Sequence, residues 1–412
     1  MKKKILVVGN SICAIAFAKK MSEEHEVYVA PSSCSFPEAV IGVDIREGNV
    51  RELLDFVMEN GIDMTIAVSE EAIKNNISSI FADNNQSIFA PTSEAAIITT
   101  DKAKAKKMLY KLRIPTPKFG IFDKQNMVND YLKNQKTPFV IKTNERNSAT
   151  ILTSILSAKN IVDSVFIDKN NKIIIEDYIY GTPFSFYAIT DGYKALPIAS
   201  AITYRHTLEG NGGQLTDGMG ACSPNYKLSV EQECNLMDNV IYPTLEQLDK
   251  EQTPYMGIIG VNGIMSENGR VSVLGWHSFF QDCDAPSILR VLDENLYDLF
   301  ESCIVGSFSD EVRTIKEKNV YAVSLVIKNN NKNNKENIIT GLDNLDEDSS
   351  IEFYPGINRN KYLEYEAGCG NVAVLTAEAS SVSKASKKVY NEVECINFKG
   401  MSYRKDICIA CK

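Results

Sequence analysis

In the first hundred residues, the apolar positions alternate between short continuous runs and helical spacing. Short β-branched runs predict buried strands, and stretches with apolar residues at helical spacing separate them. Ser11 is placed to cap the first helix, and Gly61 is placed to end the second. Because strands that alternate with helices form parallel sheets covered on both faces, we expect an open α/β domain here. The predicted strands are 4–8, 27–30 and 64–68, and the predicted helices are 12–21, 51–60 and 73–82.

The pattern changes after a lysine-rich helix at 101–112. Short runs between 138 and 189 predict an antiparallel small lid, and a mixed α+β region with a long helix at 230–249 follows. A helical stretch at 286–302 precedes a C-terminal β-rich module with one helix at 381–391. The fold class is therefore α/β. The predicted domains are 1–117 (N-terminal α/β), 118–187 (lid), 188–318 (central) and 319–412 (C-terminal).

Composition restricts the function classes. The chain has 412 residues, 44% of them hydrophobic, and a formal net charge of −9, which disfavours nucleic acid as a partner. No apolar run reaches the roughly 18 residues of a membrane span. The start "MKKKILVVGNSICAIAFA" resembles a signal peptide, but Gly9-Asn10-Ser11 interrupts it like a strand-to-helix turn, which we favour. We expect the ten cysteines to be thiols in a cytoplasmic protein.

The candidate chemistry begins with a lysine and two acids that end neighbouring strands. Lys142 ends "FVIK", and Glu176 and Asp177 end the run "KIIIED". Together they could hold a triphosphate and an adenine between two sheets, although most such lysines are solvated. A dinucleotide site has no support, because only Gly9 of the G-x-G-x-x-G fingerprint is present.

The order of these parts resembles the ATP-grasp architecture, and the motifs resemble the phosphoribosylamine–glycine ligase family nearly end to end. "TDGMGACSP" at 216–224 is close to the family's "TGGMGAYSP", the most specific match. "IDMTIAVSEEA", "DKAKAKKML", "RIPTP" and "IIIEDYIYG" follow the family's order, and "YRKDI" at 403–407 matches its closing motif.

This resemblance implies ATP-dependent joining of glycine to phosphoribosylamine in purine biosynthesis, with ATP and Mg²⁺ as cofactors and small-molecule substrates. The implied nucleotide-binding residues are Lys102, Lys142, Glu176, Asp177 and Ile179. The implied substrate-binding residues are Thr216, Asp217, Gly218, Met219, Gly220 and Asp284, and the catalytic candidates are Arg205 and Asp282.

The departures from the family are concentrated at the reactive positions. "VSVLGWHSFFQDCD" aligns with the family's "KVIEFNCRFGDPE", so its two magnesium ligands become Gly275 and His277. Mg²⁺ prefers hard oxygen ligands, which predicts weak or absent Mg²⁺ binding. The family's phosphate-binding "IKADGLAAGKGV" is "IKTNERNSATIL" here, its "GNGGREH" turn is "GNSICAI", and Thr182-Pro183 replaces a ribose-binding glutamate.

Each candidate also has a purely structural interpretation. The glycines of 210–220 could simply preserve a tight turn, and Arg205 could be a surface arginine. Apart from Lys102, the lysines of 101–112 are expected on a solvated helix face, and Trp276 in the core with His277 as a hydrogen-bonded neighbour. Three hypotheses stay open: a working glycine ligase, a ligase with other substrates, and a non-catalytic homologue that binds a nucleotide or a protein partner.

Overall fold

The computed structural model describes residues 2–33, 36, 39–143, 149–166, 172–308, 315–331 and 337–409. Its first part is a five-stranded parallel sheet in the order β3-β2-β1-β4-β5, which confirms the predicted α/β character. The strands are β1 Lys4–Val8, β2 Glu26–Ala30, β3 Val40–Gly42, β4 Met64–Ala67 and β5 Ile88–Phe89. The sheet is covered by α1 Ile12–Ser22, α2 Val50–Asn60, α3 Glu70–Lys74 and α4 Ile77–Asp83.

In this N-terminal α/β part, two local predictions are confirmed and one is wrong. Ser11 Oγ accepts the Ala14 amide at the start of α1, and Gly61 ends α2 with a left-handed φ of 61°. The single helix predicted over 73–82 is wrong, because the chain breaks between α3 and α4. Asn76 has φ 61° there, a conformation that asparagine tolerates better than most residues.

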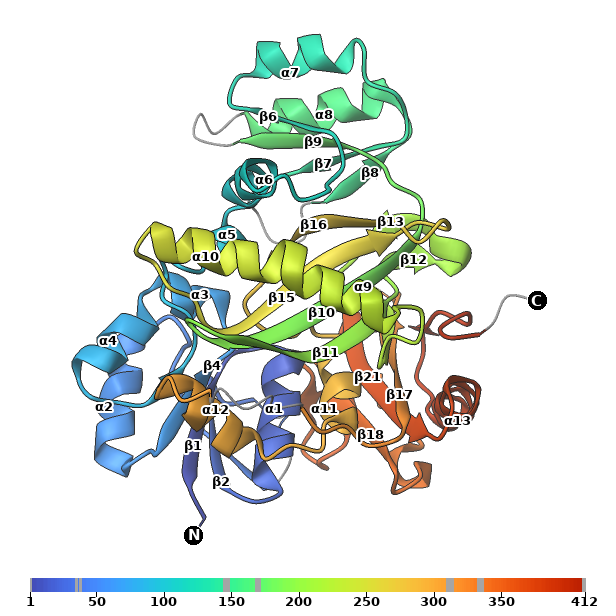
Figure 1. Cartoon of the computed structure of the whole chain (residues 1–412). Helices are drawn as coiled ribbons and strands as arrows, with labels where there is room; N and C mark the ends of the chain where they lie inside the picture. Colours follow the sequence, from blue (N-terminus) through green and yellow to red (C-terminus); the bar gives the residue numbers. More distant parts are fainter. Residues whose placement is uncertain are drawn as a thin grey trace.

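The lid is a separate layer above the rest of the molecule (Figure 1). Its antiparallel sheet has the order β6-β9-β7-β8, and two helices cover one face. The strands are β6 Phe119–Phe122, β7 Phe139–Lys142, β8 Thr150–Leu152 and β9 Ile173–Asp177. The helices, α7 Gln125–Leu132 and α8 Ile155–Val165, were not predicted, although Ser154 is an N-cap that could have signalled α8.

The central sheet runs through most of the remaining chain. Its order is β16-β15-β10-β11-β14-β17-β21-β18, and β22 pairs with β17. These strands are β10 Thr182–Asp191, β11 Ala195–Thr203, β14 Gly220–Ser223, β15 Met256–Met265, β16 Val271–His277, β17 Tyr321–Asn329, β18 Ser349–Phe353, β21 Gly370–Ala379 and β22 Met401–Ser402. The predicted domain divisions remain proposals; Tyr187 and Ala188, on either side of one division, both lie within β10.

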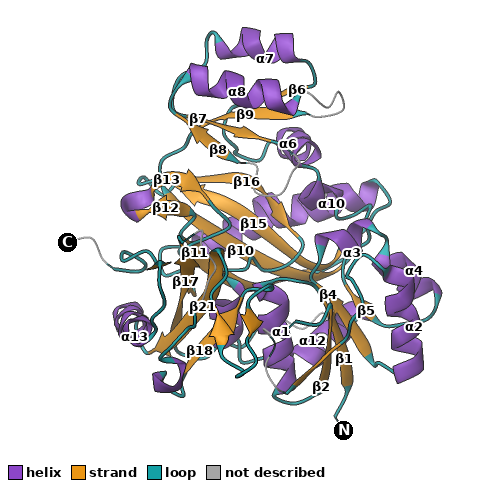
Figure 2. Ribbon diagram, turned by 180° about the vertical axis from the view of Figure 1, so that it is seen from behind, coloured by secondary structure: helices purple, strands orange, loops and turns teal. Residues whose placement is uncertain are grey.

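Helices pack on both faces of the central sheet (Figure 2). One core contains α5 Ile97–Thr100, α6 Lys102–Lys111, α9 Val230–Leu236 and α10 Tyr242–Lys250, with a π-helical turn Met237–Ile241 between the last two. The other core contains α1, α11 Ala285–Val291 and α12 Leu296–Ile304. The single helix predicted over 286–302 is therefore two helices.

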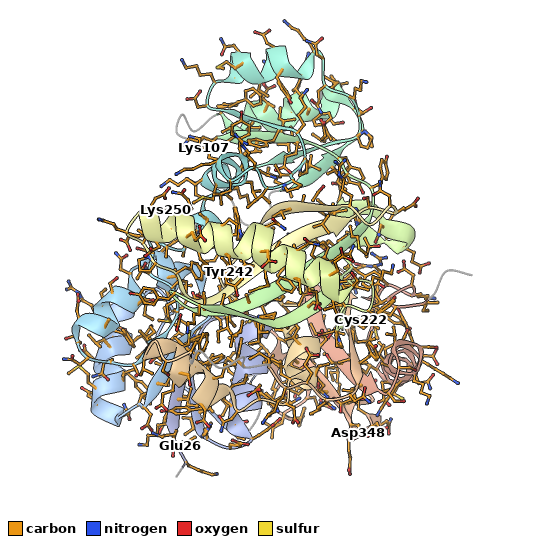
Figure 3. The ribbon with its side chains drawn as sticks, in the orientation of Figure 1. Glu26, Lys107, Cys222, Tyr242, Lys250 and Asp348 are labelled. Atoms are coloured by element: carbon orange, nitrogen blue, oxygen red, sulfur yellow. The ribbon has the colours of Figure 1, made fainter. Side chains whose placement is uncertain are left out.

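The C-terminal module continues the central sheet. Cys222 of β14 lies where the central strands meet the C-terminal strands (Figure 3), and β14 pairs with β17. The module also holds α13 Val382–Cys395 and the short pair β19 Asn358–Arg359 and β20 Tyr365–Glu366. A separate hairpin, β12 His206–Leu208 with β13 Gly212–Leu215, lies between the body and the lid. Within the described residues, the helices lack the combination of length and apolarity needed to cross a bilayer.

Candidate functional site

The first side of the candidate site is built on α6, between the lid and α10; Figure 3 labels Lys107 on this helix. Asp101 caps the helix by accepting the Ala103 amide at 2.8 Å, which positions Lys102 in the first turn. The Lys102 ammonium donates to the carbonyl of Thr143 at the end of β7, over 2.7 Å. Burial, with the nearby charge of Lys142 adding to it, lowers the pKa of Lys102 to about 8.

A buried charged triad joins α6 to the lid. Lys106 Nζ lies 3.0 Å from Glu176 Oε1, and Lys142 Nζ lies 2.9 Å from Glu176 Oε2. Lys106 also donates to Thr116 Oγ1 at 2.8 Å. Burial raises the pKa of Glu176, but the two ammonium groups outweigh it and leave this pKa lowered. Burial lowers the pKa of Lys106 to about 8, against the pull of Glu176. The triad is therefore charged near neutral pH.

Lys106 is the residue that sequence reasoning misplaced. It was expected on a solvated face, but it is 1% exposed. The helical spacing held the missing signal, because Lys106 is three residues from both Ala103 and Leu109, which are buried on the same stripe. Its position gives Glu176 a structural partner in addition to Lys142.

The hinge after β9 holds the other predicted nucleotide residues. Asp177 accepts a hydrogen bond from Gln135 Nε2 at 2.8 Å, and Ile179 lies half-buried two residues further along. Tyr178 shares a 3.1 Å hydrogen bond with His206 Nε2 and packs edge-on against Tyr180. The hinge is thus tied to the lid through Asp177 and to the β12–β13 hairpin through Tyr178.

The second side of the site is a polar face on β10, β15 and β16. In register across these strands, Ser185 faces Asn262 and Asn262 faces Gly275. In the next row, Gly260 pairs with His277. A side chain would have room at Gly275, since a Cβ built there meets nothing within 4 Å. Asn262 Oδ1 and His277 Nε2 are buried there without a hydrogen-bond partner among the described residues.

The charge at this second side is positive. Burial, with the charges of Arg205 and Lys102 adding to it, lowers the pKa of His277 to about 3, so the imidazole is neutral near pH 7. Gly275 has no side-chain ligand atom, and an imidazole is softer than the oxygen ligands that Mg²⁺ prefers. Among the described residues, no three His, Cys, Asp or Glu side chains are grouped so that they could hold a metal.

Asp282 and Asp284, which follow β16, form hydrogen bonds within the protein. Asp284 is fully buried and accepts hydrogen bonds from Tyr187 Oη at 2.8 Å and Thr203 Oγ1 at 3.1 Å, and burial raises its pKa. Asp282 Oδ1 accepts the Cys13 amide at 3.1 Å. Their carboxylates brace the body of the site in these positions.

The contact of Asp282 also concerns the first turn of α1. A helix N-terminus binds anions because its amides are free and its dipole is positive there. In this chain, Asp282 accepts from Cys13, and Ser11 Oγ accepts from Ala14 at 3.3 Å. Glu47 Oε2 accepts the Asn10 amide at 3.0 Å. Side chains of the protein itself thus occupy donors at this turn.

The glycine-rich segment has strong structural reasons for its glycines. A Cβ at Gly218, where φ is 137°, would overlap Cys283 Sγ, and a Cβ at Gly220 would lie 2.6 Å from the Ser324 carbonyl. Met219 is 4% exposed and Asp217 accepts from Cys283 Sγ at 3.6 Å through its carbonyl. These contacts favour the tight-turn interpretation for the glycines.

Arg205 and Thr216 flank the β12–β13 hairpin, and hydrogen bonds between them close its base. Thr216 donates its amide and its hydroxyl to the Arg205 carbonyl, at 2.7 and 3.1 Å. The Arg205 side chain reaches back to the Thr216 carbonyl at 3.5 Å. The charge of Arg205 also acts on His277, whose pKa it lowers. Residues 144–148, where the phosphate-binding motif departs from the family, lie outside the described part of the chain.

Comparison with known proteins indicates one family over nearly the whole chain. Three family models match: the N domain of phosphoribosylglycinamide synthetase over residues 3–99, its ATP-grasp (A) domain over 100–285 and its C domain over 329–410. The phosphoribosylamine–glycine ligase of Caldanaerobacter subterraneus subsp. tengcongensis is 27% identical over 416 residues, covering 98% of this chain and 99% of that protein. The ligase of Neisseria meningitidis serogroup B is 26% identical, with 98% of each covered.

Solved structures agree in fold. The phosphoribosylamine–glycine ligase of Thermotoga maritima has a TM-score of 0.79 at 18% identity, covering 98% of this chain and 100% of that one. Biotin carboxylase of Campylobacter jejuni, in a complex with an ATP analogue, has a TM-score of 0.70 at 15% identity, covering 100% and 95%. The predicted ATP-grasp fold is confirmed.

Proposed function

The chain belongs to the phosphoribosylglycinamide synthetase family, and from that premise we propose that it binds a nucleotide polyphosphate without Mg²⁺ and does not carry out the family's ligase reaction. The nucleotide lies between the lid and the polar face of β10, β15 and β16. The protein then acts as a binding or regulatory homologue of an active ligase.

The observation that carries this proposal is the charge at the family's metal position. Gly275 and His277 supply no negative charge, while Arg205 and Lys102 lie close enough to depress the pKa of His277. A divalent cation is repelled at such a position, whereas a phosphate group is attracted. The room beside Gly275 leaves space for an anionic oxygen where the family has a carboxylate.

The lid side supports nucleotide binding independently of the metal. Lys102 and Lys142 are held by protein contacts at the end of β7, so their ammonium groups need little reorganisation to meet a phosphate. Glu176 balances Lys142 and Lys106, which leaves one net positive charge on the triad. The hinge at Ile179 follows directly and would receive the base.

Loss of the ligase reaction is supported at a second place. The family's sugar-phosphate turn corresponds to residues 9–15, and Asp282 and Glu47 bind amides of Cys13 and Asn10 there. A substrate phosphate would have to displace carboxylates of the protein and would meet their charge. Together with the missing metal ligands, this predicts a rate loss on the order of 10³-fold or more.

A working ligase is the second candidate, and one observation favours it: identity to phosphoribosylamine–glycine ligases extends over 98% of the chain. The two functions differ in turnover. ADP release from ATP is therefore measured with Mg²⁺, glycine and freshly generated phosphoribosylamine, each omitted in turn. The proposal predicts no ADP above a blank lacking protein. ADP that depends on both substrates would establish a ligase.

Binding is tested separately by the melting temperature with ATP, in Mg²⁺ and in EDTA. Saturating ligand at about 100 times its dissociation constant stabilises a protein by about 2.7 kcal/mol, which is a measurable shift. We expect an equal shift in both buffers. A shift only in Mg²⁺ contradicts the metal-independent site, and the absence of a shift with ATP, ADP or GTP contradicts nucleotide binding.

A further inference from the structure

The β12–β13 hairpin is a small element with contacts to the lid, the hinge and the C-terminal module. Its two strands pair with each other and with no other described strand. Both ribbon views place β13 directly below β8 of the lid (Figures 1 and 2). Such an isolated hairpin is not stable by itself, so its position depends on what holds it at each end.

The lid end is held by the side chain of Gln214. The Ile151 amide donates to Gln214 Oε1, and Gln214 Nε2 donates to the Ile151 carbonyl, both over 3.2 Å. Ile151 belongs to β8, an edge strand, and in an antiparallel pair every second residue directs both backbone groups away from its partner strand. The side-chain amide of Gln214 forms hydrogen bonds with both the N–H and the carbonyl of Ile151, as a neighbouring strand would.

The body end is held by Arg404, in the "YRKDI" motif. Its side chain is 2% exposed, and its guanidinium donates to the His206 carbonyl at 3.0 Å and towards Asn211 Oδ1 at 3.4 Å. Asp406 binds the same guanidinium through both oxygens and accepts the Gly210 amide at 2.9 Å. This is a bidentate charge-assisted pair, which fixes geometry more firmly than neutral bonds do.

A third contact joins the hairpin to the hinge. The imidazole of His206 shares the 3.1 Å hydrogen bond with Tyr178, directly after β9. The hairpin therefore contacts the lid at two places, the free edge of β8 and the hinge that follows β9. Its fixed end is buried, while the Gln214 side chain is exposed to water, so the Gln214 contact is the one that opens at least cost.

We propose that residues 206–215 form a strap that ties the lid to the body of the protein, with Gln214 as its latch and Arg404 as its anchor. Both are positioning residues, because they act through the lid and the hairpin. The effect on a nucleotide rests on the proposed function: opening the latch admits and releases it. The strap itself exists whether or not a nucleotide binds.

The test compares Gln214→Ala with Glu209→Ala, a matched control in the exposed turn of the same hairpin. Hydrogen–deuterium exchange of the Ile151 amide is followed in the nucleotide-free protein. Losing two exposed hydrogen bonds should raise its exchange about tenfold in Q214A and leave it unchanged in E209A. Gln214→Glu keeps the acceptor and loses the donor, so its exchange should be intermediate.

The same variants are then tested for release of a fluorescent ADP analogue, which should be several-fold faster from Q214A than from E209A. Exchange at Ile151 that is equal in Q214A and the wild type overturns the strap. Raised exchange of the Ile151 amide together with unchanged ADP release overturns the role of the strap in nucleotide release. Raised exchange in a protein that binds no nucleotide at all supports the strap and removes the proposed function alone.

Discussion

The two sides of the candidate site differ in how their polar groups are paired. On the lid side, Lys106 and Lys142 form ion pairs with Glu176 at 3.0 and 2.9 Å. On the strand side, Asn262 Oδ1 and His277 Nε2 are buried without partners in the part of the chain that is described. The comparison teaches that polar groups on one side of a site can stay without protein partners while the other side forms its own ion pairs.

The physical reason lies in what each group does for folding. Removing Glu176 would leave the buried Lys106 and the partly buried Lys142 without a counter-charge, so the triad is expected to contribute to stability as well as to binding. A metal-ligand carboxylate at position 275 would contribute to binding but add a charge that the fold must solvate. Gly275 adds no such charge, and a Cβ built there meets nothing within 4 Å. Function at that position can therefore change without loss of the fold.

The largest expected effect comes from breaking the lid-side triad. Glu176→Ala should lower the free energy of unfolding by about 3–5 kcal/mol, because it leaves the buried Lys106 and the partly buried Lys142 without their carboxylate. Urea unfolding followed by Trp276 fluorescence measures this. Asp177→Ala is the control on the same strand; it loses the hydrogen bond from Gln135 and should cost about 1 kcal/mol. Equal losses in both variants would show that the triad adds no stability.

The next effect concerns ligand affinity on the same side. Lys102→Met should weaken binding of ADP about 10–100-fold, since a hydrogen bond from an ammonium to a phosphate contributes about 1.5–3 kcal/mol. Calorimetric titration measures the affinity. Lys104→Ala on the same helix, where the side chain is exposed, is the control and should bind as the wild type does. Unchanged affinity in K102M would place the nucleotide away from α6.

Sequence patterns predicted most of the strands and far less of the site. The strand at Lys4–Val8 and the stop at Gly61 depend on local chemistry, and both are found where the pattern puts them. The contacts that define the site are long-range: Asp282 meets Cys13 across 269 residues, and Ile151 meets Gln214 across 63. Periodicity reports which face a residue lies on and not which partner it meets there.

A third prediction uses the pH dependence of the triad. The pKa of Lys106 is lowered from 10.5 to about 8 in the folded protein, so between these values the unfolded chain binds more protons. Stability contributed through Lys106 therefore rises with pH over this window. The difference in unfolding free energy between the wild type and Lys106→Met should grow by about 2 kcal/mol from pH 8 to pH 10. A constant difference would mean that Lys106 has an ordinary pKa.

The smallest effect is the most direct test of the comparison, because it rebuilds the strand side. The double variant G275E/H277N places a carboxylate and an amide where the family has its metal ligands, and Gly275 has room for the side chain. We expect the wild type to bind ADP equally in Mg²⁺ and in EDTA, and the double variant to bind it about tenfold more tightly in Mg²⁺. Calorimetry in the two buffers measures the ratio.

The matched control for this rebuilding is G275A/H277N, which makes the same change at His277 but adds no carboxylate. Its affinity should be the same in both buffers, so that any Mg²⁺ dependence of the first variant is due to the new negative charge. If the wild type already showed the tenfold preference for Mg²⁺, the positive charge of Lys102 and Arg205 would not govern the cleft. The contrast between its two sides would then be one of packing alone.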